Sequence, residues 1–164
     1  GVKDIALSTF VHPGNAVDFL PELSAAGFEG FRHTRLWPSR VARLMREFHI
    51  GEMAEKSTAM ALLIEIPGGQ ILNTRANMRK IVPASITVRR WKHILDSACA
   101  TGRVAHLWCH PENFLSAPSG FAVLQDILAH VARRRDQGDL LVLTQEAYCR
   151  YVRDISDRQR APRH

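Results

Sequence analysis

Short apolar strands alternate with amphipathic helices along this chain, and that alternation limits the folds it can adopt. Residues 104–110 read as a strand, with a helix capped by Thr87 before it and another helix beginning after Ser119. Residues 140–143 (LLVL) are a further strand candidate, followed by a helix over residues 146–155. Strands and helices at this spacing predict an α/β fold with a mainly parallel sheet in a single domain.

The first part of the chain has the same kinds of element with less regular patterning. Ser39 suits the N-cap of a helix that ends at Gly51 and turns one apolar face inward. Residues 52–86 have no clear pattern: residues 61–66 fit either a strand or a helix, and residues 68–85 predict a long irregular connection. The other expected elements are strands over residues 6–11 and 28–34 and a helix from Asp18 to Gly27. The expected inward side chains of the Ser39 helix are Val41, Leu44, Met45 and Phe48.

Composition excludes several classes of protein. Hydrophobic residues make up 46% and charged residues 23%, which is typical of a globular domain. No apolar run approaches the roughly 20 residues that a membrane span needs. The net charge is +6, but the densest cationic cluster, Arg133–Arg135, falls in the last turn of a predicted helix, where cations complement the helix dipole. We therefore expect no nucleic-acid partner and no membrane span.

The three cysteines are Cys99, Cys109 and Cys149, an odd number without a CxxC pair. A disulfide framework or a zinc knuckle is therefore disfavoured, and reduced buried thiols are the simpler interpretation. Reduced thiols suit a cytoplasmic location, which we expect for this chain.

The stretch HLWCHPENF, residues 106–114, carries the most informative chemistry. In a strand His106, Trp108 and His110 share one face, while the residues between them point the other way. The two histidines would lie about 13 Å apart at about 3.3 Å per residue, too far to share one metal ion. We therefore expect no metal site from this pair.

His110 occupies the carboxyl end of its expected strand, the edge at which parallel α/β sheets place their chemistry. A histidine there can act as general acid or base near neutral pH. It can equally serve as a structural group that hydrogen-bonds a loop carbonyl, and spacing alone leaves both open.

Other polar and aromatic side chains follow the predicted strands in the same way. If the strand ends converge, they form a polar pocket with aromatic walls, which suits a sugar ring. Core packing is an equal alternative for Trp37 and Trp108. The candidate substrate-binding residues are Asn15, Arg32, Trp37, Trp108 and Asn113.

Four segments in this order resemble the C-terminal half of a bacterial polysaccharide deacetylase. They are STFVHPGN, AAGFEGFRHTRLW, HLWCHPENF and ILAHVARRRDQGDLLVLT. The third segment, with the helix and GDLLVLT after it, is the most specific, and residues 52–86 match weakly. The resemblance implies a partial, distorted (β/α) barrel of mainly parallel strands over residues 1–164, and a carbohydrate esterase.

The family resemblance implies metal-assisted hydrolysis of an acetyl or similar acyl group on an amino sugar or glycan. An aspartate and two histidines hold zinc or a similar divalent ion, a second aspartate is the base, and a late histidine protonates the leaving amine. That last role maps onto His110. Trp108, Asn113, Asn15, Arg32 and Trp37 would contact the sugar.

The sequence also departs from the family. The early aspartate pair is absent, since Asp4 lacks its context, and the H-x-x-x-H of the second family motif is absent too. Gly14 stands where many relatives carry arginine. We therefore expect a chain that begins partway through its domain, has no metal ligands of its own and is inactive alone. Such a chain would self-associate or need the missing segment, and the alternative is a non-catalytic carbohydrate-binding or interaction module.

Overall fold

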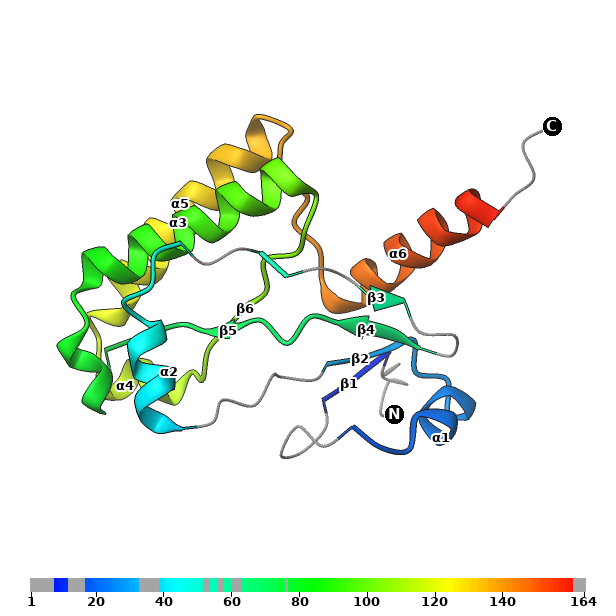
Figure 1. The fold of residues 1–164 in the computed structure, drawn as a ribbon, viewed down its shortest axis with the longest axis horizontal. Coiled ribbons are helices and arrows are strands. Elements are labelled where there is room, and N and C mark those ends of the chain that lie inside the picture. Colours follow the sequence, from blue (N-terminus) through cyan, green and yellow to red (C-terminus); the bar gives the residue numbers. More distant parts are fainter. Residues whose placement is uncertain are drawn as a thin grey trace, which may run out of the picture. The chain divides into compact units, whose positions relative to one another are not determined.

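The computed structural model describes residues 8–11, 17–32, 39–51, 54–55, 58–59, 63–75 and 77–160. The fold is mixed α/β with short, mainly parallel strands, as the alternation of elements predicts (Figure 1). The chain packs into two compact units. Unit 1 takes its described residues from 1–35, 57–68 and 143–164, and unit 2 from 36–56 and 69–142.

Unit 1 is built on a four-stranded sheet in the order β1-β2-β4-β3. Strands β1 (Thr9–Val11), β2 (Gly30–Arg32) and β4 (Ile64–Ile66) run parallel, and β3 (Thr58–Ala59) is antiparallel to β4. The expected strands over 6–11 and 28–34 are thus confirmed over shorter spans. Helix α1 (Leu20–Ala25) lies between β1 and β2 in sequence and carries proline in its first turn, where the missing N–H costs no hydrogen bond.

Helix α6 (Gln145–Arg160) packs against β2 and β4 and completes unit 1. Its fully buried residue is Cys149, which clusters with Ile64 and Ile66. Gly30 makes this approach possible, because a Cβ there would lie 2.4 Å from Cys149 Sγ. The helix predicted over residues 146–155 is confirmed, and Tyr151 on it is exposed.

Unit 2 holds two long helices beside a two-stranded parallel sheet. Helix α3 (Ala84–Thr101) packs against α5 (Gly120–Asp136), and β5 (Gln70–Ile71) pairs with β6 (Leu107–Trp108). The helix predicted before residue 104 is confirmed, and Trp91 and its apolar neighbours on it fill the core. The helix begins three residues before Thr87, and its N-cap position is Pro83. The other core residues are Ala54, Leu72, Ile94, Leu95, Ala98, Phe114, Val123 and Ile127.

A charged cluster fastens α3 to α5 at the surface. His130 Nε2 on α5 lies 2.8 Å from Asp96 Oδ1 on α3, and Arg134 Nε donates to the same oxygen at 3.0 Å. Burial alone would raise the pKa of Asp96, but the hydrogen bond and charge of His130, together with Arg134, bring it below its ordinary value. Arg134 thus has a structural role here beyond complementing the helix dipole.

Residues 68–85 were expected to form a long irregular connection, and that prediction is wrong where they form β5 and the 3-10 helix η2 (Asn77–Ile81). The less clearly patterned residues before them include β3 and β4. Of the residues expected as strand or helix, Ile64–Ile66 form a strand. Strands of two or three residues are too short for a period of two to appear in the sequence.

The LLVL segment, residues 140–143, is not a strand as expected. It has no regular structure, and Leu141 and Val142 are 65% and 59% exposed. Strand propensity reflects packing against neighbouring strands rather than the backbone itself. The segment instead carries the chain from unit 2 to unit 1.

Helix α2 (Arg40–Arg46) begins where predicted, because Ser39 Oγ accepts a hydrogen bond from the backbone N–H of Ala42 at 3.0 Å. The predicted inward face is wrong: Val41, Met45 and Phe48 are exposed, and Leu44 is only half-buried. The buried residue is Glu47, at the end of the helix.

Glu47 is buried because it pairs with Arg90 of α3. Arg90 is 1% exposed, and its guanidinium lies 3.3 Å from Glu47 Oε2 and also donates to Gln70 Oε1 on β5. One arginine therefore joins the end of α2, the middle of α3 and a strand. Removing one partner of such a pair leaves an uncompensated buried charge.

We expect Arg90→Leu to lower the free energy of unfolding by about 3–5 kcal/mol, because Glu47 and Gln70 lose their partner inside unit 2. Urea denaturation followed by circular dichroism measures the change. Arg89→Leu is the matched control, since Arg89 is exposed on the same helix and its loss should cost less than about 0.5 kcal/mol. Equal effects of the two substitutions would contradict a stabilising role for the buried pair.

A second prediction concerns Cys149. Burial, with a further contribution from the Glu29 carboxylate, raises the pKa of its thiol to about 11 from an ordinary value of 9.0. The thiol therefore stays protonated to a higher pH in the folded state than in the unfolded state. The free energy of unfolding falls as pH rises from about 9 to about 11. Urea denaturation at several pH values in this range should show a smaller fall in the free energy of unfolding for Cys149→Ala than for the unchanged chain. Cys99→Ala should leave the fall unchanged, and a loss of slope in that control would refute the assignment.

Candidate functional site

The two parallel strands of unit 2 set the position of the HLWCHPENF segment. Gln70 N–H donates to the carbonyl of His106 at 2.9 Å, and Leu72 N–H donates to that of Trp108 at 2.8 Å. The paired strand spans only Leu107–Trp108, shorter than the expected 104–110. Val104 instead forms a separate antiparallel bridge with Glu55.

The alternation predicted for this strand is confirmed on both of its faces. Leu107 and Cys109 pack against the core of unit 2. The rings of Trp108 and His110 meet edge to face on the other side, with centroids 5.3 Å apart and an interplanar angle of 90°. Trp108 thus supports the imidazole from one side and limits its rotation.

His110 lies two residues after the last residue of β6, and its side chain is 55% exposed. Its Nδ1 lies 3.6 Å from Glu112 Oε1, which is also exposed. Attraction between such groups is weak in water, so the contact orients the ring more than it stabilises the fold. With Nδ1 turned to the carboxylate, Nε2 is the ring nitrogen left for a ligand.

Asn113 lies beside His110 because helix α4 (Glu112–Ser116), which the sequence analysis did not predict, begins immediately after His110-Pro111. Its backbone N–H donates to the carbonyl of His110 at 3.0 Å. The short turn thereby brings His110, Glu112 and Asn113 together. A residue pair such as Pro111-Glu112, with proline followed by an acid at a helix start, is the signal that could have predicted α4.

The remaining candidates are Arg32, Asn15 and Trp37. Arg32 ends β2 in unit 1, where it is half-buried and burial lowers the pKa of its guanidinium. Asn15 and Trp37 lie outside the described residues. The structure thus brings together three of the six candidate site residues, namely Trp108, His110 and Asn113.

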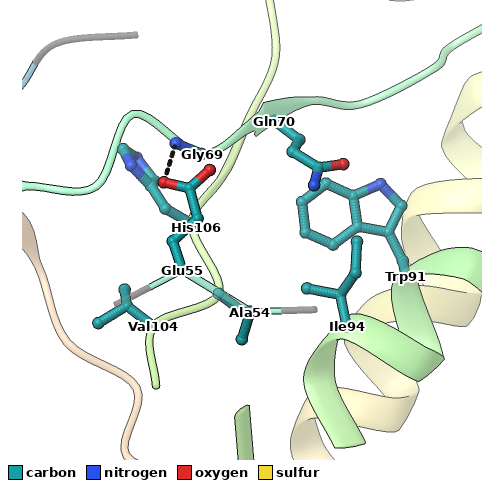
Figure 2. Close-up of a pocket in the computed structure, with 9 residues that line it drawn as sticks. Ala54, Glu55, Gly69, Gln70, Trp91, Ile94, Val104 and His106 are labelled. Carbon is teal, nitrogen blue, oxygen red and sulfur yellow. Dashed lines mark hydrogen bonds between the residues drawn. The ribbon is translucent and has the colours of Figure 1, made fainter. Parts of the chain in front are cut away.

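A small pocket lies at the other end of the same segment, where His106, Glu55 and Gln70 meet Trp91 of α3 (Figure 2). Gly69 N–H donates to Glu55 Oε2 at 3.4 Å across one edge of it. The free space is about 10 Å³, roughly that of one water molecule. The pocket is thus a place for a bound water rather than for a sugar.

The implied metal ion does not fit the described residues. No three histidine, cysteine, aspartate or glutamate side chains converge among residues 8–11, 17–32, 39–51, 54–55, 58–59, 63–75 and 77–160. His106 belongs to the pocket and His110 to the exposed site. In the part of the chain that the structure covers, no helix has the length and apolar character needed to cross a membrane.

Comparison of the chain with protein-family models, curated proteins and solved structures gave no significant match.

The pairing of β5 with β6 holds the site in place, and Gly69 lies next to this pairing. A substitution of Gly69 therefore tests the pairing. Gly69 has φ 67°, and a Cβ there would lie 2.1 Å from the carbonyl oxygen of His106. We expect Gly69→Ala to destabilise the chain by about 2 kcal/mol or more and to speed amide exchange at Leu72, whose N–H bonds across the pair.

Gly102→Ala is the matched control for this substitution. Gly102 has nearly the same φ, 63°, but no atom lies within 4 Å of its Cβ position. Its cost should be only the backbone strain of about 1 kcal/mol. If the two substitutions cost the same, the close approach to His106 does not limit the pairing.

Proposed function

We propose that this chain is a polysaccharide deacetylase-like domain, built on part of a distorted (β/α) barrel, that acts on an acylated amino sugar. His110 is the proton donor to the leaving amine. The observation that carries this proposal is the exposed His110 imidazole at the carboxyl end of β6, with Nδ1 3.6 Å from Glu112 Oε1. This is the sheet edge at which α/β folds bind and transform ligands.

The geometry indicates which nitrogen would act. In the protonated ring Nδ1–H points toward Glu112, so Nε2–H remains for the substrate. When the amide C–N bond of the sugar breaks, the nitrogen takes the Nε2 proton and leaves as an amine.

Trp108 and Asn113 supply the sugar contacts in this proposal. An aromatic ring offers its face to the apolar C–H groups of a pyranose, and an amide hydrogen-bonds hydroxyl groups. Both side chains are only partly buried, so a ligand can reach them.

No metal-dependent step is assigned to the described residues, because they do not supply an ion site. The ion that the family uses polarises the acyl oxygen and the attacking water. What we assign to this chain is therefore sugar binding and proton donation, and we expect the isolated chain not to release acetate.

A non-catalytic carbohydrate-binding module is the second candidate. The edge-to-face contact of Trp108 with His110 favours it as much as it favours catalysis, since it holds an aromatic surface in place whether or not a proton moves. The two candidates differ in what His110 does.

Release of acetate from N-acetylated chito-oligosaccharides by the full gene product, with a divalent ion supplied, tests the proposal. We expect His110→Gln to lower kcat by about 100-fold or more, because the amine then leaves without a positioned acid. Trp108→Ala should instead raise KM, by about tenfold, through lost contact with the ring.

His93→Gln is the matched control, since His93 is an exposed histidine of α3 in the same unit. It should leave both constants unchanged. Sugar binding that is lost in Trp108→Ala, with no acetate released by the unchanged protein, would establish the binding module instead. If no acylated sugar binds at all, both candidates fail.

A further inference from the structure

The apolar surface at the candidate site is wider than strand β6 alone. Strand β5 runs parallel to β6, and Ile71 is in register with Trp108 (Figure 1). Residues in register on neighbouring strands point to the same face of a sheet, and every second residue of a strand shares that face. Ile71 therefore lies beside Trp108, on the face that also carries His110.

The burial of the neighbouring residues agrees with this assignment. Gln70 and Leu72, on either side of Ile71, are buried, and Leu72 packs into the core of unit 2. Ile71 between them is only half-buried, as Trp108 is. The two half-buried side chains thus leave apolar surface that a ligand at His110 can contact.

Ile71 and Trp108 form one apolar row across the two strands, and we call this pair the floor. Neighbouring strands lie about 4.8 Å apart, which is close to the length of one unit in a chain of sugars. A sugar whose ring lies on Trp108 therefore has the next unit of the same chain within reach of Ile71.

The floor has a single row on the β5 side. Gly69, two residues before Ile71, has no side chain, and a Cβ there would collide with the carbonyl oxygen of His106. Asn73, two residues after Ile71, is fully buried, and its Oδ1 accepts a hydrogen bond from the backbone N–H of Arg75 at 2.8 Å. Of these three residues, Ile71 is thus the one whose side chain a ligand can reach.

The groups around the floor favour a sugar as its ligand. Ile71 and Trp108 offer apolar surface to the C–H groups on the face of a pyranose ring. His110 and Asn113 follow Trp108 in the chain and offer hydrogen bonds to the polar groups at the edge of the ring. A ligand that is apolar throughout would leave these polar groups unmatched.

We propose that Ile71 is a further sugar-contacting residue, and that the site binds two consecutive units of a glycan, one on Trp108 and the next on Ile71. This inference rests on the sugar binding proposed above, and it holds whether or not His110 donates a proton. A monosaccharide on Trp108 does not reach Ile71, so a disaccharide should bind more tightly than a monosaccharide.

Isothermal titration of the full gene product with N-acetylglucosamine and with N,N′-diacetylchitobiose tests the floor. We expect the disaccharide to bind at least about fivefold more tightly, because it alone covers the apolar surface of Ile71. Ile71→Thr keeps the β-branched shape that a strand favours and removes part of the apolar surface. It should lower the affinity for the disaccharide about fivefold and leave the affinity for the monosaccharide within about twofold.

Ile81→Thr is the matched control, because Ile81 is an exposed isoleucine of unit 2 on η2, outside the pairing of β5 with β6. It should leave both affinities unchanged. Equal losses for both sugars in Ile71→Thr would show that the substitution acts through the fold of the site rather than through contact.

The comparison of the two sugars with the unchanged protein needs no variant. Equal affinities for the monosaccharide and the disaccharide would show that Trp108 alone forms the floor. This result, or equal losses in Ile71→Thr, overturns the inference about Ile71 and leaves the function proposed for His110 intact. If neither sugar binds, the inference and the proposed function fail together.

Discussion

The structure of unit 2 depends on an arginine that water cannot reach. Arg90 projects from α3, and its guanidinium lies between Glu47 and Gln70. Helix α3, the end of α2 and strand β5 therefore share one charged group. A guanidinium in such surroundings requires its carboxylate and its amide oxygen at fixed positions. Because of this requirement, α2 is docked through Glu47, and its apolar side chains remain at the surface.

Most of the helical structure could be predicted from the sequence, because helices of sixteen to eighteen residues repeat their apolar pattern several times. The core face of α3 follows directly from Trp91, Ile94, Leu95 and Ala98. The strands could not be delimited, since two or three residues carry no period. Glu47 could not be foreseen as buried either, because its partner is 43 residues away in sequence.

The candidate site was partly predictable for the same reason. Alternation along residues 106–110 correctly separated Trp108 and His110 from Leu107 and Cys109. The role of Glu112 was not foreseen, because it depends on the turn that begins α4 and not on strand periodicity. Strand-end position also grouped Arg32 with residues of unit 2, although it belongs to unit 1. Position at a strand end places a residue at one edge of one sheet, and the described residues form two separate sheets.

The exposed LLVL segment has a consequence for handling the protein at high concentration. Leu141, Val142 and Leu143 are all exposed, uncharged and good strand formers, and the segment contains no proline. Separate molecules of the same chain can begin to pair as intermolecular β-structure at segments of this kind. Asp139 and Glu146 stand on either side of it, in the place where gatekeeper charges oppose such pairing. The colloidal behaviour of this protein therefore depends in part on two carboxylates that lie outside the site.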